Sequence, residues 1–337
     1  MIGRRATVTG GALVLALTAG GLIWGLGLRG EESHEAPADT CRGALSAGEA
    51  GKFFGGAELE FRGHTGQWVG QETEYCEAWA AGEGAGGARL ELNIRPTAAH
   101  RASGAAESSS ATPIGFGWNG SFAVSDRARA GVLVDCAPLP GKGLLVLAEA
   151  SQDVEELTDA QMIQVARFAT ESARLAADRF GCEGALGRRP SKVDSTPWQK
   201  RPVAEAEGTC RGVVGSQDAA RLGLTAVSEK PAGRALTEAC SSDLPAEGHH
   251  FSLTAYYGPS AQQEMYLDGR YPGSVKGALT RTHDCEGALG AAYFKFEEFP
   301  RPDSEKGVRS TVDGEDAQRL LTAFATASGA RHGCPVA

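Results

Sequence analysis

The first feature of the chain is a long run without charge near the amino terminus. Ala6–Leu28 holds no charged residue and lies between Arg4-Arg5 and Arg29. As a helix rising ~1.5 Å per residue, this run spans about 34 Å, close to the ~30 Å core of a bilayer. The positive-inside rule places Arg4 and Arg5 in the cytoplasm. We therefore predict a cytoplasmic tail (1–5) and a membrane-spanning segment (6–28), with the remainder extracytoplasmic.

A cleaved signal peptide is the main alternative for this run. Its cleavage needs a small-x-small site directly after the apolar region, and glutamates separate Ala36-Pro37-Ala38 from that region. A lipoprotein signal needs a cysteine there, but Cys41 lies well beyond Leu28. A twin-arginine signal from Arg4-Arg5 has a poor continuation. We favour an uncleaved anchor. Either reading places residues 29–337 outside the cytoplasm.

Beyond the anchor, the pattern alternates between the periods of strands and helices. Leu90–Ile94 alternates apolar and polar positions, as a half-buried strand does. Asp159–Phe180 and Asp316–Ala330 carry an apolar stripe at helical spacing. Leu45–Phe54 and Asp218–Leu224 predict shorter helices. The other predicted strands are Ala57–Phe61, Tyr75–Ala80, Ser121–Val124, Val132–Cys136, Leu144–Ala148, Phe251–Tyr257, Val275–Thr282 and Ala291–Phe296.

Short motifs occur twice in the same order. Thr40–Gly43 (TCRG) recurs at Thr209–Gly212, and Gly181-Cys182 recurs at Gly333-Cys334. Such internal repetition indicates duplication of one structural unit. We predict an α+β fold with two tandem homologous domains, 41–182 and 210–334. Each is an antiparallel sheet packed with an N-terminal and a C-terminal helix. Segment 29–40 is then an acidic stalk, and 183–209 an exposed, semi-extended linker.

The eight cysteines divide evenly between the two repeats. None has the C-x₂₋₄-C spacing of a structural metal site, so disulfides within each repeat are expected. We favour a sequential pairing over a nested one, which would join the outer two and the inner two cysteines of each repeat. The sequential pairs are Cys41–Cys76, Cys136–Cys182, Cys210–Cys240 and Cys285–Cys334.

Composition narrows the range of partners and cofactors. A net charge of −9 argues against a nucleic-acid partner, because affinity for phosphate depends on clustered cations. Gly82-x-Gly84-x-x-Gly87 matches a dinucleotide motif, but Leu90–Ile94 after it is a predicted strand rather than a helix. We read these glycines as a hairpin loop and predict no cofactor.

No arrangement of residues predicts catalysis or metal binding. H-E-x-x-H and G-x-S-x-G are absent from the sequence. The adjacent His249 and His250 would point to opposite faces of a strand. Asp135 and Asp284 each precede a cysteine, and turn capping explains both. The aromatic group Phe116, Trp118 and Phe122 is the candidate ligand groove.

Three motifs carry a resemblance to other proteins. Asp39-Thr40-Cys41, Cys76-x-x-Trp79 and Phe180-Gly181-Cys182, in this tandem layout, resemble uncharacterised actinobacterial (Streptomyces-like) secreted or membrane-anchored proteins with paired cysteine-containing domains. The resemblance implies an extracytoplasmic location and this fold, and no activity. The second repeat departs from the pattern, because Asp243 stands three residues after Cys240.

The function expected from these features is binding. We predict a non-enzymatic, membrane-anchored protein whose partner is an envelope protein or a small-molecule ligand. A secreted hydrolase with an active site that no motif reveals, or a structural envelope spacer, is the alternative. Converging titratable groups in a deep pocket of one repeat would favour the hydrolase. A shallow groove at equivalent positions of both repeats would favour binding.

Overall fold

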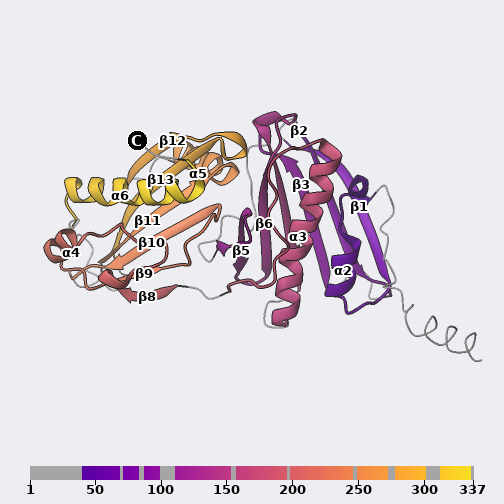
Figure 1. Ribbon diagram of the computed structural model, residues 1–337, viewed down its shortest axis with the longest axis horizontal. Coiled ribbons are helices and arrows are strands. Elements are labelled where there is room, and N and C mark those ends of the chain that lie inside the picture. Colours follow the sequence, from indigo (N-terminus) through magenta and orange to yellow (C-terminus); the bar gives the residue numbers. More distant parts are fainter. Residues whose placement is uncertain are drawn as a thin grey trace, which may run out of the picture. The chain divides into compact units, whose positions relative to one another are not determined.

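The computed structural model describes residues 40–334 apart from 69–70, 83–86, 99–110, 153–156, 196–197, 246–248, 272–277 and 301–311. The fold is α+β, with two antiparallel sheets and, within the described residues, five α-helices (Figure 1). None of the described helices is long and apolar enough to cross a bilayer. The predicted anchor (6–28) and most of the predicted stalk (29–40) lie outside the described residues.

The first sheet has seven strands in the order β1-β2-β3-β7-β6-β5-β4. α2 (Ala47–Phe53) and α3 (Asp159–Phe180) pack on one of its faces, over buried leucine, isoleucine and valine side chains of the central strands. A capping box at Thr158 fixes the start of α3. The strands are β1 (Leu59–Trp68), β2 (Gln71–Ala80), β3 (Arg89–Pro96), β4 (Thr112–Pro113), β5 (Asn119–Val124), β6 (Ala128–Asp135) and β7 (Gly143–Ala150).

The second sheet has six strands in the order β12-β13-β11-β10-β9-β8. Its helices are α4 (Ser216–Leu222), α5 (Pro259–Arg270) and α6 (Gly314–His332). α6 covers the face that carries Phe294, whereas α5 contacts Tyr293 and Lys295, which alternate onto the opposite face. The strands are β8 (Gln199–Pro202), β9 (Ala226–Glu229), β10 (Thr237–Asp243), β11 (His249–Tyr257), β12 (Leu279–Asp284) and β13 (Ala291–Pro300).

Five strands of each sheet share both order and register. β1-β2-β3-β7-β6 corresponds to β9-β10-β11-β13-β12. Positions in corresponding rows are called equivalent below. One row of cross-strand partners in the first sheet is Gly63, Cys76, Leu92, Ala148 and Ala130. The corresponding row in the second sheet is Glu229, Cys240, Leu253, Phe296 and Leu279.

The disulfides follow the sequential pairing, so the preferred prediction is confirmed and the nested alternative is wrong. One bond of each repeat joins the segment before its first helix to the second strand, and the other joins the end of the sheet to the end of the closing helix. The bonds are Cys41–Cys76, Cys136–Cys182, Cys210–Cys240 and Cys285–Cys334.

A buried ion pair also recurs at equivalent positions. Glu74 and Glu238 each stand two residues before the second cysteine of their repeat and are 3% and 1% exposed. Arg179 Nη1 donates to Glu74 Oε2 at 2.9 Å, and Arg331 Nη2 donates to Glu238 Oε2 at 2.5 Å. Each arginine stands three residues before the last cysteine. The pair therefore fixes the closing helix against the second strand.

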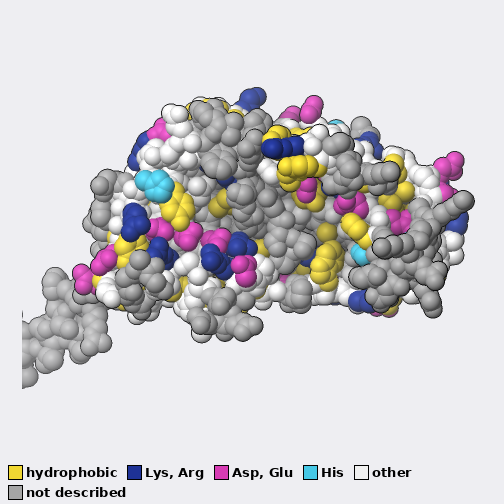
Figure 2. Space-filling view, turned by 180° about the vertical axis from the view of Figure 1, so that it is seen from behind, with side chains coloured by type: hydrophobic (Ala, Val, Ile, Leu, Met, Phe, Trp, Pro, Cys, Tyr) yellow, Lys and Arg dark blue, Asp and Glu magenta, His cyan; other side chains and the backbone are white. Residues whose placement is uncertain are grey.

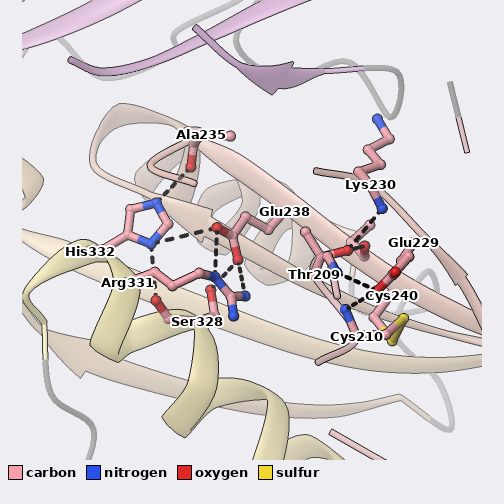
Figure 3. Close-up of polar contacts among 12 residues, drawn as sticks. Thr209, Cys210, Glu229, Lys230, Ala235, Glu238, Cys240, Ser328, Arg331 and His332 are labelled. Atoms are coloured by element: carbon pink, nitrogen blue, oxygen red, sulfur yellow. Dashed lines mark hydrogen bonds and ion pairs between the residues drawn. A yellow bond between two sulfur atoms is a disulfide. The ribbon is translucent and has the colours of Figure 1, made fainter. Parts of the chain in front are cut away.

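In the second repeat this pair belongs to a larger polar network (Figure 3). Ser328 Oγ donates to Glu238 at 2.8 Å and lies 2.6 Å from the hydroxyl of Tyr257. Burial, with the Glu238 carboxylate nearby, raises the pKa of Tyr257. His332 stacks on Tyr257, and its Nε2 lies 2.8 Å from the carbonyl oxygen of Ala235. Every carboxylate oxygen of Glu238 has a donor, as burial demands.

The segment predicted to be an exposed linker is mostly exposed or partly exposed, and it is also hydrogen-bonded to both repeats. Trp118 Nε1 donates to the carbonyl of Arg188 at 2.8 Å, and Arg167 Nε donates to that of Pro190 at 2.7 Å. Gln199–Pro202 forms β8 beside β9. The proline and arginine content that suggested an extended linker provides rigid backbone whose carbonyls accept these bonds.

We expect Arg331→Ala to lower the free energy of unfolding by about 3 kcal/mol, because it leaves Glu238 buried without its cation. Denaturant titration with intact disulfides measures the change. The exposed Arg211 is the matched control, and Arg211→Ala should stay within ~0.5 kcal/mol of the wild type. Equal stability of the two variants would contradict a structural role for the pair.

Candidate functional site

One face of the first sheet has no helix on it within the described part of the chain. α2 and α3 lie on the other face, where Leu90, Leu92 and Ile94 are buried. Side chains one position along these strands point away from the helices. Figure 2 looks from this side and shows arginine and glutamate side chains intermixed over the sheet. We call these side chains of β1, β2, β3, β6 and β7 the charged face.

A single row of charges crosses this face. In the register of the sheet, Arg62 lies opposite Glu77, Glu77 opposite Glu91, Glu91 opposite Glu149, and Glu149 opposite Arg129. Directly opposed residues on antiparallel strands have Cβ atoms ~4.5–5.5 Å apart, and like charges at that spacing are destabilising. Three glutamates in succession therefore cost the sheet free energy.

Arginines at the two ends of the row hold its outer carboxylates. Arg129 Nε donates to Glu149 at 2.8 Å and Arg127 Nη1 donates to it at 2.9 Å. The bonds to Glu149 raise the pKa of both guanidinium groups. At the other end, Arg89 lies 3.3 Å and Arg62 3.6 Å from Glu77.

Tyr75 contacts two neighbouring carboxylates of the row. Its hydroxyl donates to Glu77 at 3.3 Å and also hydrogen-bonds with Glu91. Burial raises the pKa of the Tyr75 phenol, and these two carboxylates raise it further. The phenol therefore stays protonated and serves as a donor between two carboxylates.

Trp79 gives the charged face an aromatic centre. The guanidinium carbons of Arg62 and Arg89 lie 5.5 and 5.9 Å from its ring centroid, within cation–π range. Its Nε1 donates to Glu60 at 2.9 Å. Tryptophan, tyrosine and arginine are the residue types that dominate the energetics of binding surfaces.

The second repeat shows that the fold does not need this row. The positions equivalent to Arg62, Glu77 and Glu91 are Ser228, Ser241 and Ser252, and only Glu149 has an acidic equivalent, Glu297. Trp79 is replaced by Asp243. The disulfides and the Arg–Glu pair occur in both repeats, whereas the charged row occurs in one. We attribute the shared features to folding and the charged row to function.

A pocket lies elsewhere, between β8, β9 and the segment before Cys210. Its volume is about 270 Å³. Burial lowers the pKa of Lys230, one of its lining residues, to about 8. The lining residues are Gln199, Arg201, Glu207, Gly208, Glu229, Lys230, Pro231 and Ala232.

The aromatic residues proposed as a ligand groove do not line one. Trp118 and Phe122 are 2% and 1% exposed and belong to the hydrophobic core of the first repeat, so the prediction that they line a ligand groove is wrong. The loop bends back at Phe116, with φ of +56°, and so directs Trp118 inward. Phe116 is partly exposed and packs against the same core.

The histidines and aspartates singled out in the sequence have structural partners. His249 and His250 lie on opposite faces of β11 as predicted, His249 3.1 Å from Glu298 and His250 stacked on Phe299. Asp135 accepts the N–H of Ala288 in the second repeat at 2.6 Å, so it does not cap its own turn. Asp284 is exposed, and turn capping stays a prediction for it.

Wider searches add no functional assignment. Protein-family models, curated proteins and solved structures give no match to the chain. Within the described residues, no group of three or more histidine, cysteine, aspartate or glutamate side chains is arranged to hold a metal ion. The comparison between the two repeats is therefore the guide to function.

If the charged row is not needed for folding, Glu91→Ser should leave the free energy of unfolding within ~0.5 kcal/mol of the wild type or raise it, since it removes carboxylate repulsion. Glu74→Ser is the contrasting variant, because its carboxylate is buried and paired with Arg179. It should lose about 3 kcal/mol. Chemical denaturation measures both. A large loss in Glu91→Ser would assign the row to folding.

The lowered pKa of Lys230 predicts a pH effect on stability. Between pH 8 and 10 the unfolded chain keeps the lysine proton and the folded chain loses it, so stability rises with pH. Lys230→Met removes this contribution. The difference in unfolding free energy between wild type and variant should therefore move in favour of the wild type across this range. A constant difference would show that the pKa is not lowered.

Proposed function

We propose that the protein is a membrane-anchored, extracytoplasmic, non-enzymatic binding protein, and that the charged face of its first repeat binds a polar ligand or partner in the cell envelope. The observation that carries this proposal is the charged row, which one repeat has and the other lacks. Natural proteins keep such locally unfavourable arrangements where function requires them.

The location rests on two features of the chain. Four disulfides are typical of proteins that fold in an oxidising compartment. The uncharged segment 6–28 has the length of a membrane anchor. Together they support an envelope protein with a cytoplasmic amino terminus.

Duplication supports the assignment of roles to the two repeats. Strand order, strand register, disulfides and the buried ion pair all recur, which favours two homologous domains over a coincidence of fold. After duplication, one domain can acquire a binding surface while the other keeps a plain one. The serines at the equivalent positions of the second sheet form such a plain surface, without a charged row.

The chemistry of the charged face favours a polar partner. At one end of the row the arginine stands further out than the carboxylate it contacts: the Arg62 side chain is 62% exposed and that of Glu77 is 8% exposed. Guanidinium groups make bidentate hydrogen bonds to oxygen acceptors, and Trp79 offers a flat ring between two of them. An oxygen-rich partner fits this surface best.

A hydrolase is the second candidate, because Glu77, Glu91 and Tyr75 bring acid and base groups together in one repeat only. Pairs of carboxylates perform such chemistry in enclosed sites. Here they lie across an open sheet face, and the pocket lined by Gln199 and Arg201 is in the other repeat. This geometry favours binding over catalysis.

Binding to isolated cell envelope tests both candidates. We expect the purified full chain with intact disulfides, held in lipid nanodiscs so that segment 6–28 is already inserted, to sediment with the isolated envelope, and Trp79→Ala to weaken this binding about tenfold or more, as loss of an aromatic contact in a binding surface does. Asp243→Ala, at the equivalent position of the second repeat, is the matched control and should bind normally. Unchanged binding by Trp79→Ala would contradict the proposal. Release of soluble envelope fragments that stops in Glu91→Gln would identify a hydrolase.

A further inference from the structure

We infer that the pocket beside β8 and β9 is a second binding site, which takes a small ligand through a carboxylate or phosphate group held by Arg201. The site is separate from the charged face and belongs to the second repeat. It goes beyond the proposed function, because it assigns a small-molecule ligand to the repeat whose sheet carries no charged row.

The pocket depends on features that the first repeat lacks. β8 is an additional strand next to β9, whereas among the described residues no strand of the first sheet lies beyond β1. Glu229, which pairs with Gln199 of β8, has Gly63 as its equivalent. Gln199 and Arg201 alternate onto the side of β8 that faces the pocket, and Lys200 points to the other side, where it pairs with Asp243 at 2.9 Å.

Glu229 is already satisfied and does not serve a ligand. Its carboxylate accepts the backbone N–H groups of Glu207 at 3.0 Å, Gly208 at 2.9 Å and Cys210 at 3.2 Å. Figure 3 shows this carboxylate turned towards Cys210. Glu229 thus fastens the backbone around the Cys210–Cys240 disulfide and forms a fixed wall of the pocket.

Arg201 is the group that a ligand can reach. Its Nε lies 3.5 Å from the fixed carboxylate of Glu229, its Nη1 lies 3.3 Å from Glu207, and its Nη2 donates to Gln199 at 3.1 Å. The Glu207 side chain is 76% exposed, so its ion pair with Arg201 contributes little and is readily displaced. This carboxylate shows where an oxyanion fits against the guanidinium, and a ligand oxyanion would take its place.

The surroundings favour an anion of modest size. Lys230 is one of the lining residues, and its buried side chain donates from Nζ to the carbonyl of Ala111 at 2.9 Å. Trp198 lies beside it, with the ring centroid 5.2 Å from Nζ and the residue 37% exposed. A pocket of about 270 Å³ has room for a small organic acid or a phosphate ester.

Isothermal titration of the full chain with sodium succinate and with inorganic phosphate tests the site, and the two arms show which oxyanion it takes. We expect at least one of them to bind in the millimolar range or tighter. Arg201→Gln should weaken that binding about tenfold or more, because it removes a charge-assisted hydrogen-bond donor. Glu207→Gln should strengthen it, because it removes the competing carboxylate.

Lys200→Gln is the matched control, since it removes one positive charge from the same strand on the side away from the pocket. It should leave binding unchanged. No heat of binding with either anion, equal weakening by Arg201→Gln and Lys200→Gln, or weaker binding by Glu207→Gln would each overturn the inference. None of these results bears on Trp79, so the charged face is tested independently.

Discussion

A guanidinium from the last turn of the closing helix, held against a buried carboxylate on the second strand, is the contact on which each repeat depends. Glu74 and Glu238 are almost inaccessible, and a lone carboxylate in such a place is very unfavourable. Arg179 and Arg331 therefore set the position of α3 and α6 along the sheet. In each repeat the glutamate stands two residues before a cysteine of one disulfide, and the arginine stands three residues before a cysteine of the other. The ion pair and the two disulfides therefore fix the same geometry.

The strand order and register that the two sheets share make each repeat a control for the other. Features that recur at equivalent positions are explained by folding, and those that occur once call for a different explanation. The row Arg62–Glu77–Glu91–Glu149–Arg129 is such a feature, because its counterpart in the second sheet is mainly serine. The pocket at Arg201 is another, because it is lined by β8, which has no counterpart in the described part of the first sheet.

The sequence predicted the frame better than the candidate sites. Cysteine order predicted all four disulfides, and the apolar stripe of Asp159–Phe180 matches the bounds of α3. α5 was missed, because its face towards the sheet is polar and includes Asp268, which binds Tyr293 and Lys295. The charged row was missed because its members come from five strands, and strand register, which brings them together, is not visible in the spacing of one sequence.

The two repeats use the same end of their sheets differently, and this leaves the charged face open. Leu133 and Leu145 of the first sheet are buried in the core of the second repeat. Their equivalents, Thr282 and Tyr293, contact α5 instead, through Met265 and Asp268. α5 therefore covers in the second sheet the area that the second repeat covers in the first. The opposite end of the first sheet carries the charged row. Within the described chain, no helix packs on the side chains of this row, and the core of the second repeat does not contain them. A binding surface at that end is compatible with the packing that joins the repeats.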